Sequence, residues 1–370
     1  MTENASLEND LGPAKTIWVR EPRIGLKAAL VVDNVACGPS IGGLRMAPDV
    51  SIEECARLAR AMTLKNAAAG LAHGGGKSVM WGDPRMPRER KEQWIRAFAH
   101  ALRNETDYIF GPDMGTDETC MAWIQDEIGR AVGLPAALGG LPLDELGATA
   151  WGLLHCAEAA APYAGIVLKG ARLAVQGFGA VGKHSACFFS ERGAKLVAAS
   201  DTAGTIADPG GLDVAALSRL KEQGRSVCDY PGAGKLDRDA VIGIECDIWI
   251  PAARPDVVRA DNVDRMQTKL VLQGANIPFT PEAEKTLAGK GVIVVPDFIA
   301  NAGGVICAAM EYAGATRSAA FDSIAERVRG NTERVLSDAK ARGVLPRQAA
   351  SDLAEARVRD AMRYRRFSIL

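Results

Sequence analysis

The sequence has little of several features that would place it in a specialised class of protein. Its formal net charge is only −1, from 44 Lys and Arg against 45 Asp and Glu, so it has no overall positive field that would hold nucleic acid or an anionic membrane. No apolar run approaches the roughly 18 to 20 residues that a bilayer-spanning helix needs, and the polar first residues do not form a signal peptide. We therefore expect a cytoplasmic protein that binds neither nucleic acid nor a membrane.

The sequence also lacks the usual patterns of metal and disulfide sites. Eight cysteines are present, but they lie far apart and form no C-x-x-C pair, and the four histidines have no ligand spacing. We expect reduced, mostly buried thiols and no bound metal.

Glycine, in contrast, is abundant and clustered. The chain of 370 residues contains 39 glycines, more than the roughly 7% of average usage. They gather at 42–43, 74–76, 177–182 and 303–304. Because glycine permits positive φ and close approach of the backbone, we interpret these clusters as backbone left open to ligands.

Periodicity predicts two domains of the α/β class. In the N-terminal part we expect a strand over 29–33, a helix that begins with a capping box at Ser51 and Glu54 and continues to residue 69, a strand over 78–81 and a helix over 88–103. We read Gly42-Gly43 as a chain break and place the domain boundary at Gly139 to Pro142. Further strands are expected at 172–176, 195–200, 247–250, 270–273 and 291–295, and helices at 148–161, 181–192, 213–223 and 281–289. This alternation predicts a doubly wound, Rossmann-type parallel sheet over 141–339.

The clearest motif is a G-x-G-x-x-G that follows a predicted strand and opens a predicted helix. It consists of Gly177, Phe178, Gly179, Ala180, Val181 and Gly182. Asp201 ends the next predicted strand, near the spacing of roughly 20 residues expected of the acid that binds the adenosine ribose. We therefore predict a dinucleotide site; the alternative is a glycine-rich turn that binds nothing. Thr202 to Thr205 offers no Arg or Lys for a 2′-phosphate, which favours NAD over NADP.

Three charged residues in the N-terminal part are candidates for chemistry. Lys65 falls on an otherwise apolar helix face, Lys77 follows three glycines, and Asp113 follows a short apolar segment. Each also has an ordinary interpretation: a lysine that extends to solvent, a lysine at a turn, and an aspartate in an Asx-turn. Taken together, Lys65 can pair with a substrate carboxylate, Lys77 near a second cation would have a lowered pKa, and Asp113 can accept the proton of an amine.

Seven stretches of this sequence resemble the glutamate, leucine, phenylalanine and valine dehydrogenases. They are Gly42 to Arg45, Met62 to Asn66, Gly74 to Lys77, Gly111 to Thr116, Gln176 to Gly182, Gln273 to Asn276, and Pro296 to Val305. The resemblance implies that an L-amino acid, NAD and water give a 2-oxo acid, ammonium and NADH.

The resemblance also implies roles for particular residues. Lys65 resembles the carboxylate-binding lysine, Lys77 the lysine that activates water, and Asp113 the general base at the amine. Thr149, Asn276 and Asn301 resemble groups near the nicotinamide and substrate, and Gly42, Ile41 and Ala308 fall at substrate positions. The family fold implies a substrate domain over 1–140 with 340–370 packed back on it, a cleft beside the dinucleotide domain, and assembly into homo-oligomers.

Two departures from the glutamate enzymes bear on the substrate. Those enzymes carry a lysine immediately before Gly-Gly-x-Arg, where this chain has Ile41, and many have a serine four residues after the valine of Gly-Gly-Val, where this chain has Ile306, Cys307, Ala308 and Ala309 nearby. A buried γ-carboxylate without a partner costs several kcal/mol. We therefore expect a branched or aromatic apolar substrate.

Two alternatives stay open. One is a glutamate dehydrogenase with a rearranged carboxylate site, because Asp201 to Leu220 resembles the glutamate members more closely. The other is an NAD-binding regulator without activity, against which the presence of Lys65, Lys77 and Asp113 argues.

Overall fold

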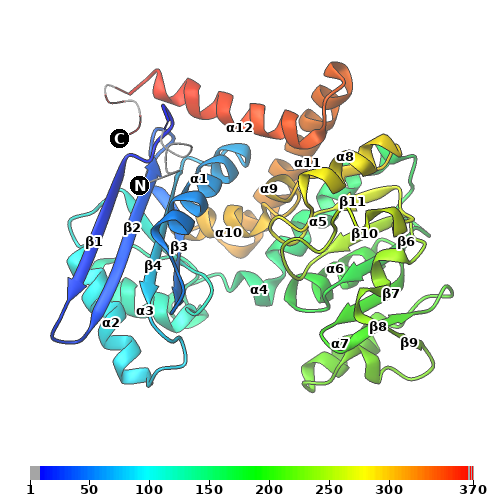
Figure 1. Cartoon of the computed structure of the whole chain (residues 1–370), viewed down its shortest axis with the longest axis horizontal. Coiled ribbons are helices and arrows are strands. Elements are labelled where there is room, and N and C mark those ends of the chain that lie inside the picture. The colour runs from blue at the N-terminus through cyan, green and yellow to red at the C-terminus, as the bar shows by residue number, and fades with distance from the viewer. Residues whose placement is uncertain (1–8, 366, 368, 370) are drawn as a thin grey trace. The chain divides into compact units, whose positions relative to one another are not determined.

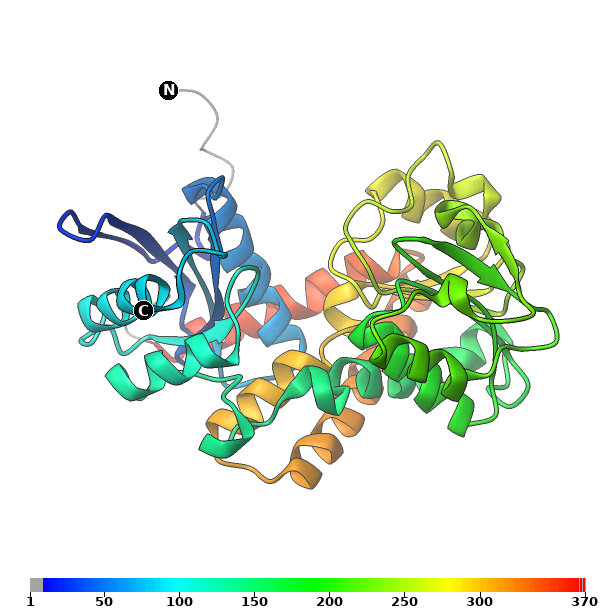
Figure 2. The same cartoon turned by 90° about the horizontal axis from the view of Figure 1, so that it is seen from below.

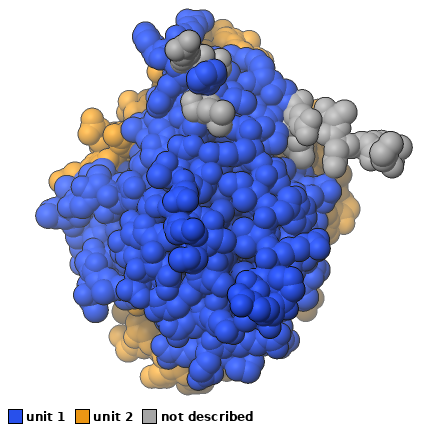
Figure 3. All heavy atoms as spheres, turned by 90° about the vertical axis from the view of Figure 1, so that its left-hand side faces the viewer, with its two compact units in different colours: residues 1–143, 305–320, 351–370 blue, residues 144–304, 321–350 orange. Residues whose placement is uncertain are grey.

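The chain folds into two α/β units in the computed structural model, which describes residues 9–365, 367 and 369 (Figure 1). Unit 1 combines residues 1–143, 305–320 and 351–370, and unit 2 combines 144–304 and 321–350 (Figure 3). This division differs from the expected one in three segments, the shortest being residues 141–143, which belong to unit 1. Residues 305–320, which include Ala308, belong to unit 1, and residues 340–350 belong to unit 2.

Unit 1 is built on a mixed five-stranded sheet in the order β1-β2-β4-β3-β5. Its strands are β1 (Lys15–Glu21), β2 (Leu26–Asn34), β3 (Ser40–Ala47), β4 (Gly74–Trp81) and β5 (Tyr108–Pro112). Its helices are α1 (Ile52–Ala68), α2 (Arg88–Ala101), α3 (Glu118–Ile128), most of α10 (Gly303–Tyr312) and most of α12 (Pro346–Met362). Strand β3 runs parallel to β4 and β5, while β2 is antiparallel to β1 and β4.

Helices cover both faces of this sheet. One face packs on α1 through a small apolar cluster that includes Val31, Cys55 and Val79. The opposite face packs on α2 and α3 through a larger cluster that includes Leu30 and Phe98. Figure 2 shows α2 and α3 (cyan) on one side of the sheet and α1 (blue) on the other. Side chains that alternate along β3 and β4 therefore point either to α1 or to the larger core.

The glycine clusters of unit 1 lie inside strands, so the expected break at Gly42-Gly43 and the expected late start of the strand at residue 78 are wrong. A Cβ on Gly42 would lie 1.8 Å from the Gly76 carbonyl oxygen, one on Gly74 would lie 1.9 Å from the Asn34 carbonyl oxygen, and one on Gly75 would lie 2.0 Å from the Thr63 nitrogen. These glycines let strands and helix α1 approach one another. For these three glycines, dense packing rather than ligand access explains the missing side chain.

Unit 2 contains a seven-stranded sheet in the order β12-β11-β10-β6-β7-β8-β9, of which the first five are parallel. Its strands are β6 (Arg172–Gln176), β7 (Lys195–Asp201), β8 (Gly204–Ala207), β9 (Gly234–Leu236), β10 (Ile248–Pro251), β11 (Leu270–Leu272) and β12 (Ile293–Val295). Its helices include α5 (Ala148–Ala160), α6 (Ala180–Glu191), α7 (Val214–Glu222), α8 (Pro281–Gly289), α9 (Asp297–Ala300) and α11 (Arg317–Arg342), while α4 (Leu143–Leu146) begins at its edge. The predicted Rossmann-type sheet is confirmed, and the antiparallel strands β8 and β9 extend it.

Within unit 1, the arginine-rich C-terminal segment contacts helix α1 and the residues that follow strand β2. Arg357 of α12 donates hydrogen bonds to the carbonyl oxygens of Ala67 and Ala68, which lie in the last turn of α1 where helical carbonyls lack partners. Arg365 donates to the Ala36 carbonyl oxygen over 3.1 Å. Arg357 and Arg365, for which the sequence predicted no role, therefore connect the C-terminal segment of unit 1 to its N-terminal segment.

None of the helices formed by residues 9–365, 367 and 369 combines the length and the apolar character that a bilayer-spanning helix requires.

We predict opposite effects for two glycine-to-alanine changes. Gly75→Ala places a Cβ against the Thr63 backbone and should lower the free energy of unfolding by about 1–3 kcal/mol. Gly330 lies within α11, and nothing lies within 4 Å of a Cβ built there, so Gly330→Ala should raise it by up to about 1 kcal/mol. Denaturant unfolding of both variants measures this. A Gly75→Ala protein as stable as the parent would contradict the packing explanation.

Candidate functional site

Unit 1 brings Lys77 and Asp113 together and adds a cation that the sequence did not single out. Lys77 lies on β4, Arg45 on β3, and Asp113 directly follows β5. Oδ2 of Asp113 lies 3.1 Å from Nζ of Lys77 and 2.7 Å from Nε of Arg45. The order of the strands places β3 between β4 and β5, so the three side chains meet across the middle of the sheet.

Burial sets the protonation of this group. Lys77 is only 6% exposed. Burial and the neighbouring Arg45 guanidinium lower the pKa of the Lys77 ammonium, against the Asp113 carboxylate, which raises it. Burial alone raises the pKa of Asp113, but the cations of Lys77 and Arg45 outweigh it and leave that pKa below its usual value. The site therefore holds an ionised carboxylate beside an amine that releases its proton more readily than a free lysine.

The contacts of Asp113 leave one of its oxygens available. Both cations bind Oδ2, and the Asp113 backbone nitrogen donates to Oγ1 of Thr116 over 3.0 Å. No hydrogen bond to Oδ1 is formed by the residues that the structure describes. Arg45 is itself held by Glu54 over 2.5 Å. Glu54 therefore does not close the expected reciprocal capping box, although the Ser51 hydroxyl does accept from the Glu54 nitrogen.

Gly43 keeps the space beside Lys77 clear. A Cβ on Gly43 would lie 3.0 Å from Nζ of Lys77 and 2.8 Å from Cβ of Asp113. Ile41 lies two residues earlier in β3 and therefore points to the same face of the sheet, with 4% of its surface exposed. The Gly42 carbonyl oxygen instead accepts a hydrogen bond from the Tyr108 hydroxyl over 2.7 Å.

Lys65 and Ala308 lie on two helices of the same unit. The Asn66 amide donates to the Gly74 carbonyl oxygen over 2.7 Å, and this bond fixes the part of α1 that carries the half-exposed Lys65 against the start of β4. Ala308 is 8% exposed on α10, and Tyr312 on that helix packs edge-on against His73.

Unit 2 contains the dinucleotide candidates, and the glycine motif has the form such a site needs. Gly177 has a φ of 92°, so the chain turns where β6 ends. Gly179 precedes α6 with no side-chain cap, and nothing lies within 4 Å of a Cβ built on it. A Cβ on Gly182 would lie 2.0 Å from the Gly177 carbonyl oxygen. The second glycine thus leaves the N-terminus of α6 open to a pyrophosphate, while the first and third serve the turn and close packing.

Phe178, Ala180 and Val181 complete the motif in different ways. The Phe178 side chain is buried at 1% exposure, and its backbone nitrogen donates to the Ser200 carbonyl oxygen, so Phe178 anchors the turn. Ala180 and Val181 form the first turn of α6.

Asp201 ends β7 as expected, but protein donors already occupy its carboxylate. Lys221 binds Oδ2 over 3.0 Å, the Ser226 hydroxyl binds Oδ1 over 2.9 Å, and the nitrogens of Val227 and Ala203 also donate. Burial raises the pKa of Asp201, and these hydrogen bonds lower it by more. Residues 202–205 did not predict this cation, because Lys221 lies on α7.

Asn276 and Asn301 are in direct contact. Nδ2 of Asn301 lies 3.0 Å from Oδ1 of Asn276 and also reaches the carbonyl oxygens of Gly274 and Ala275. Asn301 is 4% exposed, whereas Asn276 is exposed, so Asn301 holds the loop from inside while the Asn276 side chain is accessible at the surface of unit 2. Thr149 lies in the first turn of α5, where Gly303 allows close packing because a Cβ there would lie 2.1 Å from the Ala148 carbonyl oxygen.

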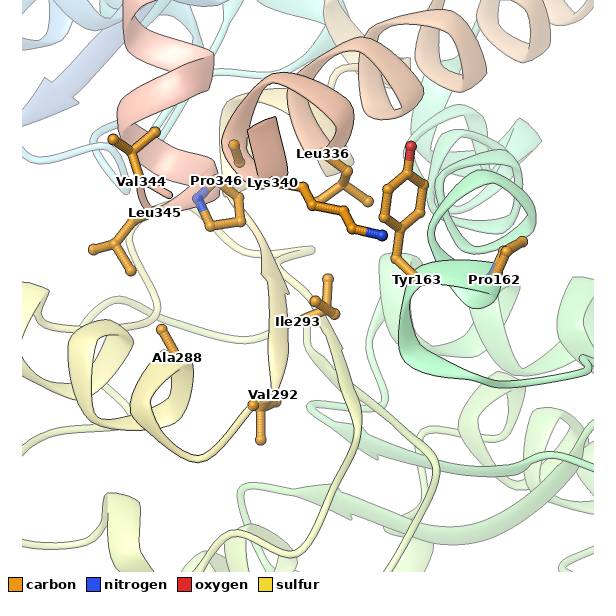
Figure 4. A pocket seen from close by; sticks show the side chains of 12 residues that line it. Pro162, Tyr163, Ala288, Val292, Ile293, Leu336, Lys340, Val344, Leu345 and Pro346 are labelled. Atoms are coloured by element: carbon orange, nitrogen blue, oxygen red, sulfur yellow. The ribbon is translucent and has the colours of Figure 1, made fainter. Parts of the chain in front are cut away.

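One groove in the described part of the chain lies apart from these residues. A groove of about 760 Å³ in unit 2 is lined by apolar side chains such as Tyr163, Ile293 and Leu336, with Lys340 beside them (Figure 4). It contains none of the predicted site residues. The part of the chain that the structure describes contains no group of three or more His, Cys, Asp or Glu able to hold a metal ion.

Comparison with known proteins matches nearly the whole chain. Residues 16–130 match the family model described as Glu/Leu/Phe/Val dehydrogenase, dimerisation domain, and residues 139–366 match the model described as Glutamate/Leucine/Phenylalanine/Valine dehydrogenase.

Three similar proteins are named glutamate dehydrogenases. The Thermotoga maritima glutamate dehydrogenase is 38% identical over 84% of this chain and 77% of its own length. The NADP(+)-dependent glutamate dehydrogenase of Pyrobaculum calidifontis is 36% identical over 84% of this chain and 78% of its own length. The crystal structure of the hetero-hexameric glutamate dehydrogenase of Thermus thermophilus, in a leucine-bound form, aligns with a TM-score of 0.83 at 30% identity, covering 95% of this chain and 89% of the other.

Proposed function

Because this chain belongs to the Glutamate/Leucine/Phenylalanine/Valine dehydrogenase family, we propose that it oxidatively deaminates an L-amino acid with an apolar side chain, with NAD as hydride acceptor. An amino acid, NAD⁺ and water give a 2-oxo acid, ammonium, NADH and a proton. The observation that carries this proposal is the Asp113 carboxylate held between Lys77 and Arg45. That group supplies a base and a proton-releasing amine in one place.

The residues of unit 1 divide the work on the amino acid. Lys65 pairs with the α-carboxylate and orients the substrate. Oδ1 of Asp113, free of protein donors among the described residues, accepts a proton from the substrate ammonium so that nitrogen can share its electron pair with the α-carbon. Lys77, with its lowered pKa, takes a proton from the attacking water and returns one to the leaving ammonia. Arg45 holds Oδ2 and keeps the carboxylate ionised.

The residues of unit 2 hold the coenzyme. The bound dinucleotide supplies the acceptor for the hydride that leaves the α-carbon. The open N-terminus of α6 after Gly179 would hold the pyrophosphate, and the positive φ of Gly177 allows the turn that leads to it. Thr149 and the Asn276 amide would orient the carboxamide end of that coenzyme.

Two positions favour an apolar substrate. Ile41 points to the sheet face that carries Lys77 and offers no charge to a side-chain carboxylate, and Ala308 offers no hydroxyl. Glutamate is the second candidate, because the relatives at 36–38% identity are named glutamate dehydrogenases. For glutamate, a different cation would have to replace the missing lysine.

The choice of coenzyme depends on Asp201. An acidic residue at this position favours the ribose hydroxyls of NAD. Lys221 pairs with that carboxylate and so brings a cation to the place where a 2′-phosphate would lie, which makes NADP the second candidate.

We further propose that the chain forms a homo-oligomer. Residues 16–130 match a dimerisation domain, and the similar Thermus thermophilus enzyme is hetero-hexameric.

A panel of amino acids assayed with both coenzymes tests the proposal. We expect NAD reduction with leucine, valine, phenylalanine or tryptophan to exceed that with glutamate. Glutamate turnover that dominates and survives Ile41→Ala would favour the second candidate with a rearranged carboxylate site. If no amino acid reduces either coenzyme at alkaline pH while NADH still binds, the chain is a regulator and the proposal is wrong.

Substitution of the two lysines should give different kinetic signatures. Lys77→Ala removes a proton-transfer group and should lower kcat by about 10²–10⁴-fold with little change in the dissociation constant of NADH. Lys65→Ala removes a charged contact to the substrate and should mainly raise KM for the amino acid, by about tenfold or more. Steady-state kinetics and calorimetry distinguish the two. Small, equal effects of both substitutions would contradict the roles assigned here.

Arg45→Gln should shift the pH profile to higher pH. The guanidinium lowers the pKa of both Lys77 and Asp113, so its removal raises both, and the rising limb of kcat/KM should move up by about one pH unit. Arg57→Gln is the matched control, since it removes an arginine charge from an exposed position of the same unit, on helix α1. An unchanged limb in Arg45→Gln, or the same shift in both variants, would contradict the coupling.

A further inference from the structure

A network of charged side chains contacts the residue that follows Asn276, and the mechanism above does not use it. Arg347, in the first turn of α12, forms a two-pronged pair with Glu284 of α8: Nε lies 2.8 Å from Oε2 and Nη2 lies 2.7 Å from Oε1. Its Nη1 lies 3.0 Å from Oδ1 of Asp297, and its Nη2 donates to Oε1 of Gln273 over 2.8 Å. All four residues belong to unit 2.

The two carboxylates and the amide of this network are shielded from water, whereas the Arg347 side chain is 30% exposed. The side chains of Glu284 and Asp297 are 6% and 9% exposed, and Gln273 is fully buried. Gln273 donates to Glu284 over 2.6 Å and accepts from the Asp297 nitrogen over 3.1 Å. Two buried carboxylates without a cation are strongly unfavourable, and Arg347 supplies the positive charge that stabilises this pair.

One of these carboxylates holds a backbone conformation that its residue disfavours. Ile277 has a φ of 48°, in the left-handed region where a β-branched residue is strained. Its backbone nitrogen donates to Oδ2 of Asp297 over 2.9 Å. The Ile277 side chain is 54% exposed, so packing of that side chain does not explain why the chain adopts this conformation.

Asn276 is therefore fixed from two sides. Asn301 binds its side-chain oxygen, and Asp297 binds the next backbone nitrogen in the chain. The second contact depends on the position of the Asp297 carboxylate, which Arg347 holds through its other oxygen.

We infer that Arg347 is a positioning residue for the reaction, which acts through Asp297 and the strained Ile277 turn to hold the Asn276 amide in its working orientation. This inference rests on the proposed function, because it needs Asn276 to contact the substrate or the nicotinamide. It assigns the start of α12 a part in catalysis without contact to any reacting atom.

A double-mutant cycle with Asn276 tests whether Arg347 acts through that amide. Arg347→Met should lower kcat/KM by about 10²-fold, as a displacement of about 1 Å at a reacting group does, and Arg347→Lys, which keeps the charge but loses the fork, should lose less. In an Asn276→Ala background the same Arg347→Met change should cost less than about threefold, because there is no amide left to position. Arg334→Met, on the exposed face of α11, is the control for loss of an arginine.

A second cycle uses the strained residue itself. Glycine adopts a φ of 48° without strain, so in an Ile277→Gly background the loss caused by Arg347→Lys should shrink severalfold. This cycle needs only the milder Arg347→Lys variant, and therefore remains available if Arg347→Met does not fold.

The outcomes separate this inference from the proposed function. If the parent protein turns over no amino acid, the proposed function fails, and both cycles are then measured on the dissociation constant of NADH. Independent, multiplying effects of Arg347 and Asn276 would overturn the inference. So would an Arg347→Met protein that melts at lower temperature but keeps the parent kcat and KM at a temperature where both are folded.

Discussion

Placing an ammonium on the buried face of a sheet is the constraint around which unit 1 is organised. Lys77 is almost completely removed from water, and a charge in that position costs several kcal/mol unless an anion meets it or a proton leaves. The structure uses both routes. Asp113 supplies the anion. Arg45 contacts the same oxygen of Asp113, so Lys77 shares that negative charge with a second cation. Strand order, the missing side chain at Gly43 and the salt bridge from Glu54 all serve this arrangement.

Unit 2 solves a different problem with similar means. The loops that we propose to face the coenzyme must present backbone and amide groups without being filled by their own side chains, and they must nevertheless be rigid. Gly179 provides the opening, while buried polar groups behind the loops provide the rigidity: Asn301 behind Asn276, and the Gln273 network behind both. In each unit, the group that would contact the substrate or coenzyme is held by a charged or amide partner that would not itself contact either.

The sequence predicted the Rossmann-type unit better than the N-terminal one. Strand β6 and helix α8 begin and end where periodicity places them, because alternating helices and strands give long, regular signals. Strand β3 was missed because Gly42-Gly43 breaks any propensity pattern, although Gly42 is explained by its contact with β4 and Gly43 by the space beside Asp113 and Lys77. Lys77 and Asp113 could be singled out from local motifs. Their partner Arg45, like Lys221 at Asp201, comes from another element, 68 and 20 residues away, and only the folded chain reveals such pairs.

The division of unit 1 into three stretches of sequence has a consequence for how the chain is made. Residues 1–143 leave the ribosome first, yet the carbonyl oxygens that end α1 bind Arg357, and α10 belongs to the same unit. During synthesis that sheet must persist with an unfinished surface while unit 2 is translated and folds. The segment that is synthesised first therefore completes its fold last, and until then its uncovered surface can bind chaperones or aggregate.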